Sequence, residues 1–344
     1  MAAPVKDVAP VPKPTVAVLG SGSWGTALAV HLARTGHRTI LWGIETDELE
    51  AMARHRVNSR YLPGVTLPDG LEIQHDFARA VTEAGQLLIV VPSHAFREVL
   101  ERAKPLIRPG QRVAWATKGF ELSTGKLPHD VADEVLGTGV PTAVLSGPTF
   151  AREVGAGLPS AMTVASRDSD YAMALARGIS DQNFRAYASG DMTGVEVGGA
   201  VKNVLAIGAG ASDGLGFGAN TRVALITRGL AEMMRLGLAL GAKRETFMGL
   251  AGLGDLVLTC TDDQSRNRRC GLLLAAGRTL EQAQAEIGQV VEGVLAARAV
   301  HDVAARHGVD MPISEQIYRV LYEGVPPKEA VHALMKRTIK SETG

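Results

Sequence analysis

Lys202 is the only charged side chain in the apolar stretch GGAVKNVLAIGAGAS, which covers residues 198–212. The length and the Val, Leu and Ile content of this stretch predict a helix, in which the residues one turn from the lysine are glycine, leucine and alanine. Small neighbours let another backbone or a ligand come close, and a desolvated ammonium needs a partner or loses its proton. Lys202 is therefore a candidate catalytic acid–base, although a lysine that extends from a helix end to water would show the same sequence.

Asp255 lies in a second apolar stretch, LAGLGDLVLT. A carboxylate that is buried among apolar residues requires a partner that is charged or donates hydrogen bonds. Lys202 is the expected partner of Asp255. The two side chains together would form a buried ion pair.

The sequence DDQSRNRR, residues 262–269, has the composition of a phosphate site. Asp262 or Asp263 is expected to cap a helix whose first turn contains Ser265, Arg266 and Asn267. Free N–H groups, a guanidinium and an amide together suit a phosphate dianion. A charged face in contact with solvent would have a similar composition, so the local sequence leaves both interpretations open.

Near its start the chain contains VAVLGSGSWGTALA, which places Gly20, Gly22 and Gly25 in the G-x-G-x-x-G spacing. In dinucleotide sites the first glycine permits a tight turn, the second lets the backbone approach a pyrophosphate, and the third allows close packing of helix on strand. An apolar strand precedes the motif, a helix follows it, and a second strand is predicted over 39–42, which a merely glycine-rich turn would not require. The pattern predicts a dinucleotide whose pyrophosphate lies at the helix N-terminus.

Further candidates follow the predicted strands. Glu45 lies about 20 residues beyond the last glycine, where an acid commonly binds the adenosine ribose, but a surface glutamate is an equal alternative. Lys118 follows VAWAT, and Gly147 and Thr149 follow AVLS, at strand ends where ligands gather in doubly wound sheets. Lys118 could instead mark where the chain meets solvent, and Thr149 could cap a helix.

The order of the elements predicts an α/β fold with a doubly wound parallel sheet, followed by an all-helical C-terminal domain. Apolar runs predict strands at 16–19, 39–42, 87–91, 113–117, 143–146, 162–165 and 184–187, and helical periodicity covers 26–34 and 96–104. Beyond about residue 192, helical stretches follow one another at 222–240, 266–276, 293–307 and 314–322. Residues 57–71, with their prolines, are predicted to be loop. We therefore expect a disordered tail over 1–14, a dinucleotide-binding domain over 15–195 and a helical substrate-binding domain over 196–340.

Composition excludes several classes of function. Lys plus Arg equals Asp plus Glu at 36 each, so charge gives no indication of nucleic acid or a membrane surface as partner. Cys260 and Cys270 form no metal-spaced or redox motif, and the nine histidines show no ligand spacing, so no metal site is expected. No apolar run is long enough to span a membrane. A small-molecule substrate and a reduced, cytoplasmic environment are expected.

Seven motifs together resemble those of bacterial NAD(P)-dependent glycerol-3-phosphate dehydrogenase. They are GSGSWGTALA, VVPSH, WATKGFE, SGPTFAREV, GGAVKNVLAIGAG, GLGDLVLTC and SRNRR, and the resemblance extends from about residue 15 to residue 335. The resemblance implies a Rossmann domain and a helical substrate domain, NAD(P)(H) as cofactor, and a homodimer. It also implies interconversion of dihydroxyacetone phosphate and sn-glycerol 3-phosphate, which supplies glycerol phosphate for phospholipid synthesis.

The resemblance also implies roles for individual residues. Lys202 is implied as the proton acceptor. The implied substrate residues are Lys118, Gly147, Thr149, Lys202, Asp255, Ser265, Arg266 and Asn267. Besides the three glycines, the implied cofactor contacts are Ser23, Trp24, Lys118, Ala151, Arg266, Val290 and Glu292. Glu292 could also be an acid favoured by a helix dipole.

At one position the chain departs from the family pattern. A basic residue that can bind a 2′-phosphate is common after the second strand, and here Ile44 and Glu45 occupy that place. We therefore expect NADH to be used at least comparably to NADPH, unless Arg54, His55, Arg56 or Arg60 folds back over the adenosine. Two rival functions are a related reductase of another small oxo acid and a dinucleotide-sensing module without catalysis. A sensor has no need of Lys118, Lys202 and Asp255 together.

Overall fold

An eight-stranded sheet forms the centre of the first half of the chain in the computed structural model, which describes residues 13–338 and 341. Its strand order is β10-β9-β8-β7-β6-β1-β2-β5. The strands are β1 (Val16–Leu19), β2 (Thr39–Trp42), β5 (Leu71–Gln74), β6 (Gln86–Ile89), β7 (Arg112–Trp115), β8 (Thr142–Ser146), β9 (Ser160–Ala165) and β10 (Phe184–Ser189). All seven predicted strands are present. Most of the predicted tail lies outside the described residues; Lys13, which is described, donates to the Thr35 carbonyl at 2.6 Å.

The sheet is parallel from β5 to β8, with Val16 of β1 opposite Thr39 of β2 and Gln86 of β6. The doubly wound sheet is confirmed, with one departure from parallel order at β9, which pairs antiparallel with β8 and parallel with β10. The link between β8 and β9 contains only the six-residue helix α6 (Ala151–Ala156), which is too short to carry the chain back to the end of the sheet at which β8 begins.

The order of the strands places a crevice beside β1. The chain runs from β1 to β2 on one side and re-enters the sheet at β6 on the other side. In such sheets ligands bind outside the carboxyl ends of the strands at this switch point. The glycine motif directly follows β1, so it lies at the mouth of the crevice.

Helices cover both faces of the sheet because the strands are apolar on both faces. Val16 and Val18 belong to one buried cluster, whereas Ala17 and Leu19 belong to the other. The first cluster is covered by α1 (Ser23–Arg34), α2 (Thr46–His55), α6 and α7 (Ser169–Ile179). The second is covered by α3 (Phe77–Glu83), α4 (Ser93–Ala103) and α5 (Pro128–Leu136), with the short η1 (Lys104–Leu106) beside them.

The prediction of a loop over 57–71 was wrong. β3 (Val57–Asn58) and β4 (Leu62–Thr66) form an antiparallel pair, which we name the β3–β4 hairpin, and β5 begins at residue 71. Each strand is only two to five residues long, too short for alternation of apolar and polar residues to be recognised beside the prolines.

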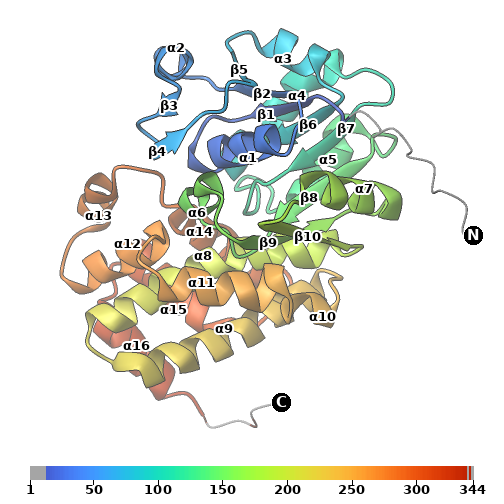
Figure 1. Cartoon of the computed structure of the whole chain (residues 1–344). Coiled ribbons are helices and arrows are strands. Elements are labelled where there is room, and N and C mark those ends of the chain that lie inside the picture. The colour runs from blue at the N-terminus through green and yellow to red at the C-terminus, as the bar shows by residue number, and fades with distance from the viewer. Residues whose placement is uncertain (1–12, 339–340, 342–344) are drawn as a thin grey trace, which may run out of the picture.

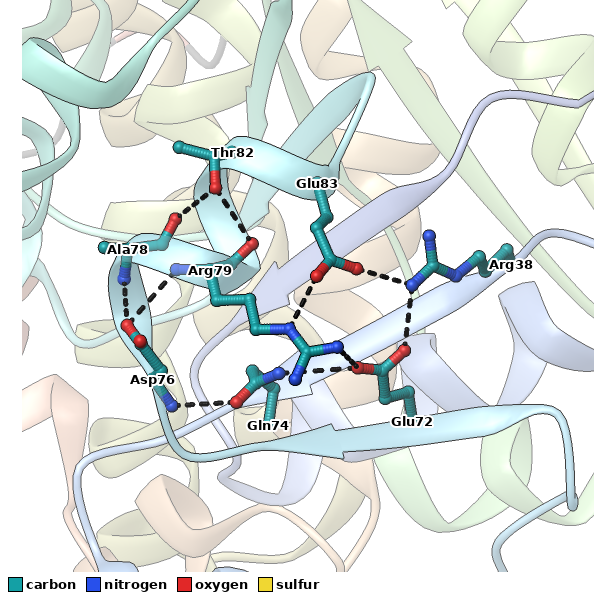
Figure 2. A network of polar contacts seen from close by, with 8 residues as sticks. All are labelled: Arg38, Glu72, Gln74, Asp76, Ala78, Arg79, Thr82 and Glu83. Atoms are coloured by element: carbon teal, nitrogen blue, oxygen red, sulfur yellow. Dashed lines mark hydrogen bonds and ion pairs between the residues drawn. The ribbon is translucent and has the colours of Figure 1, made fainter.

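A side-chain network holds β5 at the edge of the sheet (Figure 2). Arg38, just before β2, donates to Glu72 of β5 at 3.1 Å and to Glu83 of α3 at 2.6 Å. Arg79 donates to Glu83 at 2.6 Å, and Asp76 caps α3. Because several ion pairs share partners, the network fixes the relative positions of β2, β5 and α3 better than one exposed pair would.

The second half is helical and lies beneath the sheet in Figure 1 (yellow to red). Its helices are α8 (Met192–Gly214), α9 (Gly218–Ala239), α10 (Arg244–Phe247), η2 (Leu250–Gly254), α11 (Asp255–Thr261), α12 (Arg266–Ala275), α13 (Leu280–Ile287), α14 (Glu292–Arg306), α15 (Pro312–Tyr322) and α16 (Pro327–Met335). The central α8 packs against α9, α11, α12 and α14 and against β8. Most of its residues are buried, as in a helix that other elements enclose. The helices predicted from periodicity are confirmed.

Candidate active site

Lys202 and Asp255 form a buried ion pair between α8 and the start of α11. The Lys202 ammonium donates to Asp255 Oδ1 and, at 3.0 Å, to Thr259 Oγ1. The Asp255 side chain is 1% exposed and that of Lys202 is 8% exposed. The predicted partnership is confirmed, and an extension of Lys202 into water is excluded. Within the described part of the chain these contacts use two of the three N–H bonds, so one remains for a ligand oxygen.

Lys118 binds the other oxygen of the same carboxylate. Its ammonium lies 2.8 Å from Asp255 Oδ2, and it reaches that position from the loop after β7. The sequence placed Lys118 at the crevice but did not indicate this contact with Asp255. Two ammonium groups therefore share one buried carboxylate.

The arrangement shifts the pKa of both members of the pair. Burial lowers the pKa of Lys202 to about 8, even though the Asp255 carboxylate opposes that shift. For Asp255, burial alone would raise the pKa, but the charges of Lys118 and Lys202 outweigh burial and hold the pKa below its usual range. The carboxylate stays ionised near neutral pH, while the lysine can both lose and regain a proton.

Two glycines of α8 make room for the partners of Lys202. A Cβ on Gly198 would collide with the carbonyl oxygen of Ala251 in η2, the segment that leads directly into Asp255. A Cβ on Gly199 would lie 3.4 Å from Cγ of Lys118. The small residues beside Lys202 therefore permit close approach, as predicted, and what approaches is the backbone and side chain that complete the site.

A second buried carboxylate fixes the first turns of α8. Glu196 accepts from Trp115 Nε1 of β7 at 2.8 Å and from the backbone N–H of His129, at the start of α5, at 3.1 Å. Its other oxygen lies 2.5 Å from His129 Nδ1. Burial alone would lower the pKa of His129, but the Glu196 charge raises it above its ordinary value. Glu196 therefore connects the helix that carries Lys202 to the strand that precedes Lys118.

The ion pair lies in a cleft of about 660 Å³ between the two halves of the chain. The predicted residues that line it are Ser23, Trp24, Lys118, Thr149, Ala151, Lys202, Asp255, Ser265, Arg266, Asn267 and Glu292. Gly20, Gly22, Gly25, Gly147 and Val290 do not line it. Gly147 packs against Met162 of β9, and Val290 is half exposed in the loop between α13 and α14. The hydroxyl of Thr149 donates to the Gly147 carbonyl at 3.2 Å, so it does not cap α6.

The N-terminus of α12 points its first residues at this cleft. The predicted capping role of Asp262 or Asp263 was wrong, because Ser265 is the N-cap and accepts from the Arg268 N–H at 3.2 Å. Both aspartates bond elsewhere, Asp262 to the Gln264 N–H and Asp263 to the Arg268 guanidinium. A serine has a shorter side chain and no charge, so the N-terminus keeps its positive potential for an anion.

Asn267 connects three helices. Its amide N–H donates to Asn203 Oδ1 of α8 at 2.9 Å, and its oxygen accepts from the Gly293 N–H of α14 at 2.9 Å. Asn203 also lies 3.4 Å from Glu292 Oε2, and Arg266 lies 3.4 Å from Gln289 Oε1. Because Asn203 directly follows Lys202, the turn at α12 is held at a fixed distance from the pair of Lys202 and Asp255.

The glycine turn has the shape of a pyrophosphate cradle. Gly20 adopts φ +126°, in a region that favours glycine, and a Cβ there would meet the Val90 backbone. Nothing lies within 4 Å of the Cβ position of Gly22, which is the N-cap of α1 and leaves the first N–H groups of that helix without a side-chain cap. Glu45 is the N-cap residue of α2 beside this turn. Open space and free N–H groups fit a dinucleotide phosphate.

A second cleft, of about 800 Å³, lies between α8, α9, α15 and α16. Its lining is mainly aliphatic and contains none of the candidate residues named above. Among the described residues no three His, Cys, Asp or Glu side chains gather as they would around a metal ion. None of the helices in the described ranges combines the length and apolar character that crossing a bilayer needs. The candidate chemistry therefore belongs to the first cleft.

Comparison with known proteins agrees with this geometry. Residues 15–172 match the family described as NAD-dependent glycerol-3-phosphate dehydrogenase N-terminus, and residues 191–332 match its C-terminus. The chain belongs to the NAD-dependent glycerol-3-phosphate dehydrogenase family. A glycerol-3-phosphate dehydrogenase [NAD(P)+] of Aeromonas salmonicida is 57% identical over 328 residues, which cover 95% of this chain and 98% of the relative.

Solved structures of glycerol-3-phosphate dehydrogenases share the fold. The enzyme from Coxiella burnetii matches with a TM-score of 0.92 and 49% identity, over 94% of this chain and 99% of that one. A yeast glycerol-3-phosphate dehydrogenase matches with a TM-score of 0.80 and 28% identity, over 94% and 99% of the two chains. A ketopantoate reductase from Ralstonia eutropha, at 15% identity and a TM-score of 0.57, shares the fold alone.

Three residues of this candidate site were not predicted from the sequence. Asn203, Thr259 and Gln289 line the cleft and bond to Asn267, Lys202 and Arg266, respectively. Thr259 lies one helical turn after Asp255, so the i, i+4 spacing could have indicated it. Asn203 adjoins Lys202 but belongs to another face of α8, and Gln289 lies in a loop, so neither had a local signal.

Proposed function

We propose that the chain interconverts dihydroxyacetone phosphate and sn-glycerol 3-phosphate with NAD(P)(H), in the main cleft. The observation that carries the proposal is the buried pair of Lys202 and Asp255, which lies between the pyrophosphate cradle of α1 and the N-terminus of α12. A proton-transfer group, a dinucleotide site and an anion site thus share one cleft. Glycerol-3-phosphate oxidation requires these three features together.

In this mechanism Lys202 is the acid–base. When the substrate alcohol is oxidised, the neutral amine accepts the proton of the C2 hydroxyl, and in the reverse direction the ammonium donates a proton to the ketone oxygen. Asp255 orients Lys202 and stabilises its charged form. A nicotinamide cofactor, when bound, would supply the hydride chemistry. The groups that would hold the cofactor are the N–H groups of the glycine turn, Ser23, Trp24, Ala151 and Glu292, together with Val290 by the family resemblance.

The phosphate of the substrate is bound at α12. Arg266 supplies a cation, and the free N–H groups of the first turn add hydrogen bonds. Asn267 and Ser265 position this turn through their contacts with Asn203 and Arg268. Lys118 binds Asp255 inside the cleft, and by the family resemblance it contacts both substrate and cofactor. Gly147 and Thr149 shape the loop that follows β8. Anchoring the phosphate at a fixed distance places C2 for reaction.

A spectrophotometric assay tests the proposal. Purified protein should consume reduced nicotinamide with dihydroxyacetone phosphate much faster than with unphosphorylated dihydroxyacetone. A preference for a small oxo acid would support a related reductase, and cofactor binding without turnover would support a sensing module. Either result would contradict the proposal.

Three further properties belong to this proposal through the family resemblance. The chain acts as a homodimer in the cytoplasm, and its product supplies phospholipid synthesis. The boundary between its two domains lies near residue 195, close to where β10 ends and α8 begins. Sedimentation at micromolar concentration tests the dimer, since a single monomeric species would contradict it.

A further inference from the structure

Glu45 and Arg60 form an ion pair beside the glycine turn, although 15 positions separate them in the sequence. The Arg60 guanidinium lies 3.3 Å from Glu45 Oε1 and 3.5 Å from Glu48 Oε1. The same Glu45 oxygen accepts from the Tyr61 hydroxyl at 2.8 Å. Tyr61 lines the main cleft, so this pair of opposite charges adjoins the cleft next to the end of β2.

The β3–β4 hairpin brings Arg60 to this position. The amide of Asn58, a buried residue, donates to the Ser21 carbonyl at 2.9 Å and to Thr26 Oγ1 at 2.8 Å. Ser21 belongs to the glycine turn and Thr26 to α1, so the hairpin is tied directly to the cradle. Asn58 Oδ1 also accepts from the Tyr61 N–H at 3.0 Å, which fixes the short loop that carries Arg60.

The other basic residues near β2 do not reach this place. The Arg56 guanidinium donates to the carbonyls of Pro68 and Leu71. Arg54 donates to the Glu50 carbonyl in its own helix at 3.4 Å. Ile44 is 80% exposed and uncharged. Of the three arginines in this segment, Arg60 is the one that contacts Glu45.

We propose that Arg60 and Glu45 together determine the response of the chain to the 2′ position of the adenosine ribose. In this role Glu45 accepts hydrogen bonds from the unphosphorylated diol of NAD(H), as an acid after the second strand commonly does. Arg60 leaves Glu45 and binds the 2′-phosphate of NADP(H). The Arg60 side chain is 55% exposed and that of Glu45 31%, so the guanidinium can exchange one partner for another at little cost.

This inference rests on the proposed function only in requiring that a dinucleotide binds at the glycine turn. Arg60 lies outside the usual position after β2, on the β3–β4 hairpin that follows α2. The pair of Arg60 and Glu45 accounts for how a chain with isoleucine and glutamate at 44 and 45 can accept both cofactors. Tyr61 holds Glu45 in place when the guanidinium moves.

Binding titrations that use the fluorescence of the reduced nicotinamide as readout test the role of Arg60 and Glu45 without turnover. Arg60→Ala should raise the Kd for NADPH about tenfold or more, as loss of a charge-assisted contact does, and change the Kd for NADH by less than about twofold. Glu45→Gln should raise the Kd for NADH and lower the Kd for NADPH. Arg54→Ala removes an equal charge from the same segment and should leave both constants unchanged.

A second pair of probes separates this inference from the proposed reaction. Adenosine 2′,5′-bisphosphate and 5′-AMP carry no nicotinamide, and isothermal titration measures them without catalysis. Arg60→Ala should weaken the binding of the bisphosphate and leave the binding of 5′-AMP unchanged, even if the chain proved inactive on glycerol 3-phosphate. Equal losses for both probes, or no loss for either, would overturn the role of Arg60.

Discussion

Lys118 and Lys202 bind opposite oxygens of one carboxylate, that of Asp255. The carboxylate is almost completely buried, so the three groups form one unit with a net positive charge while both lysines are protonated. An oxyanion that develops on the substrate would be stabilised by that charge. Loss of one proton from Lys202 makes the unit neutral and prepares it to accept the proton of an alcohol.

Replacing Lys202 with alanine should abolish turnover and spare cofactor binding. The general acid–base is lost, which typically costs on the order of 10²–10⁴ in rate. Steady-state kinetics and a fluorescence titration of the cofactor measure the two effects separately. Near-normal turnover in a folded variant would exclude Lys202 as the acid–base.

The pH dependence should have opposite signs in the two directions. Burial lowers the pKa of Lys202 to about 8, so the neutral base accumulates as pH rises through that value. The oxidative kcat/KM should therefore rise with pH and level off above about 8, whereas the reductive kcat/KM should fall over the same range. Initial rates in each direction, measured from mildly acidic to alkaline pH, give both profiles.

In Asp255→Asn the rise of the oxidative kcat/KM with pH should occur at lower pH. The carboxylate raises the pKa of Lys202, so its removal leaves burial and the Lys118 charge, which both lower that pKa. The maximal rate should fall as well, because the lysine loses its orientation. Asp302→Asn, an exposed substitution on α14, is the control and should leave the profile unchanged. An unshifted pH profile in the Asp255 variant would contradict the effect of the Asp255 charge on the pKa of Lys202.

Arg266→Leu should raise the KM for dihydroxyacetone phosphate far more than the KM for dihydroxyacetone. A charge-assisted contact is worth roughly 1.5–3 kcal/mol, and only the phosphorylated substrate can make it. Arg278→Leu removes an equal charge from an exposed position outside the cleft and serves as the control. Equal losses on both substrates would assign Arg266 a structural role.

Gly198→Ala should lower both the melting temperature and the activity. An added Cβ would collide with the Ala251 carbonyl, a backbone atom that cannot rotate away. Overpacking of this kind costs about 1–3 kcal/mol, more than the roughly 1 kcal/mol that alanine gains in a helix. At Gly190 a Cβ would meet nothing within 4 Å, so Gly190→Ala should change neither property in thermal melts and rate assays.

Features that depend on residues close together in the sequence could be predicted, whereas features that depend on residues far apart in the sequence could not. The glycine motif and α8 are continuous in sequence, and their local patterns predicted strand, turn, helix and the isolated lysine. The edge strand β5 was missed because its position depends on Arg38, Glu72 and Glu83, which come together only in the fold.

The same limit applies within the candidate site. The pairing of Lys202 with Asp255 followed from charge and burial, which a sequence displays. The second partner, Lys118, lies 137 positions away from Asp255, so only the fold brings it there. The position of Arg60 depends on the Asn58 amide and on a hairpin whose short strands resembled a loop.

The pair of His129 and Glu196 makes the fold and the chemistry respond to pH in opposite ways. The Glu196 charge raises the pKa of His129, so the stability that imidazolium adds is complete below about pH 6.5 and disappears as pH rises through the folded-state pKa. Alkaline conditions thus favour the neutral form of Lys202, which accepts the proton of the alcohol, while they weaken the contact of its helix with His129 of α5. The stability of the folded protein should therefore fall with rising pH while the oxidative kcat/KM rises towards its plateau.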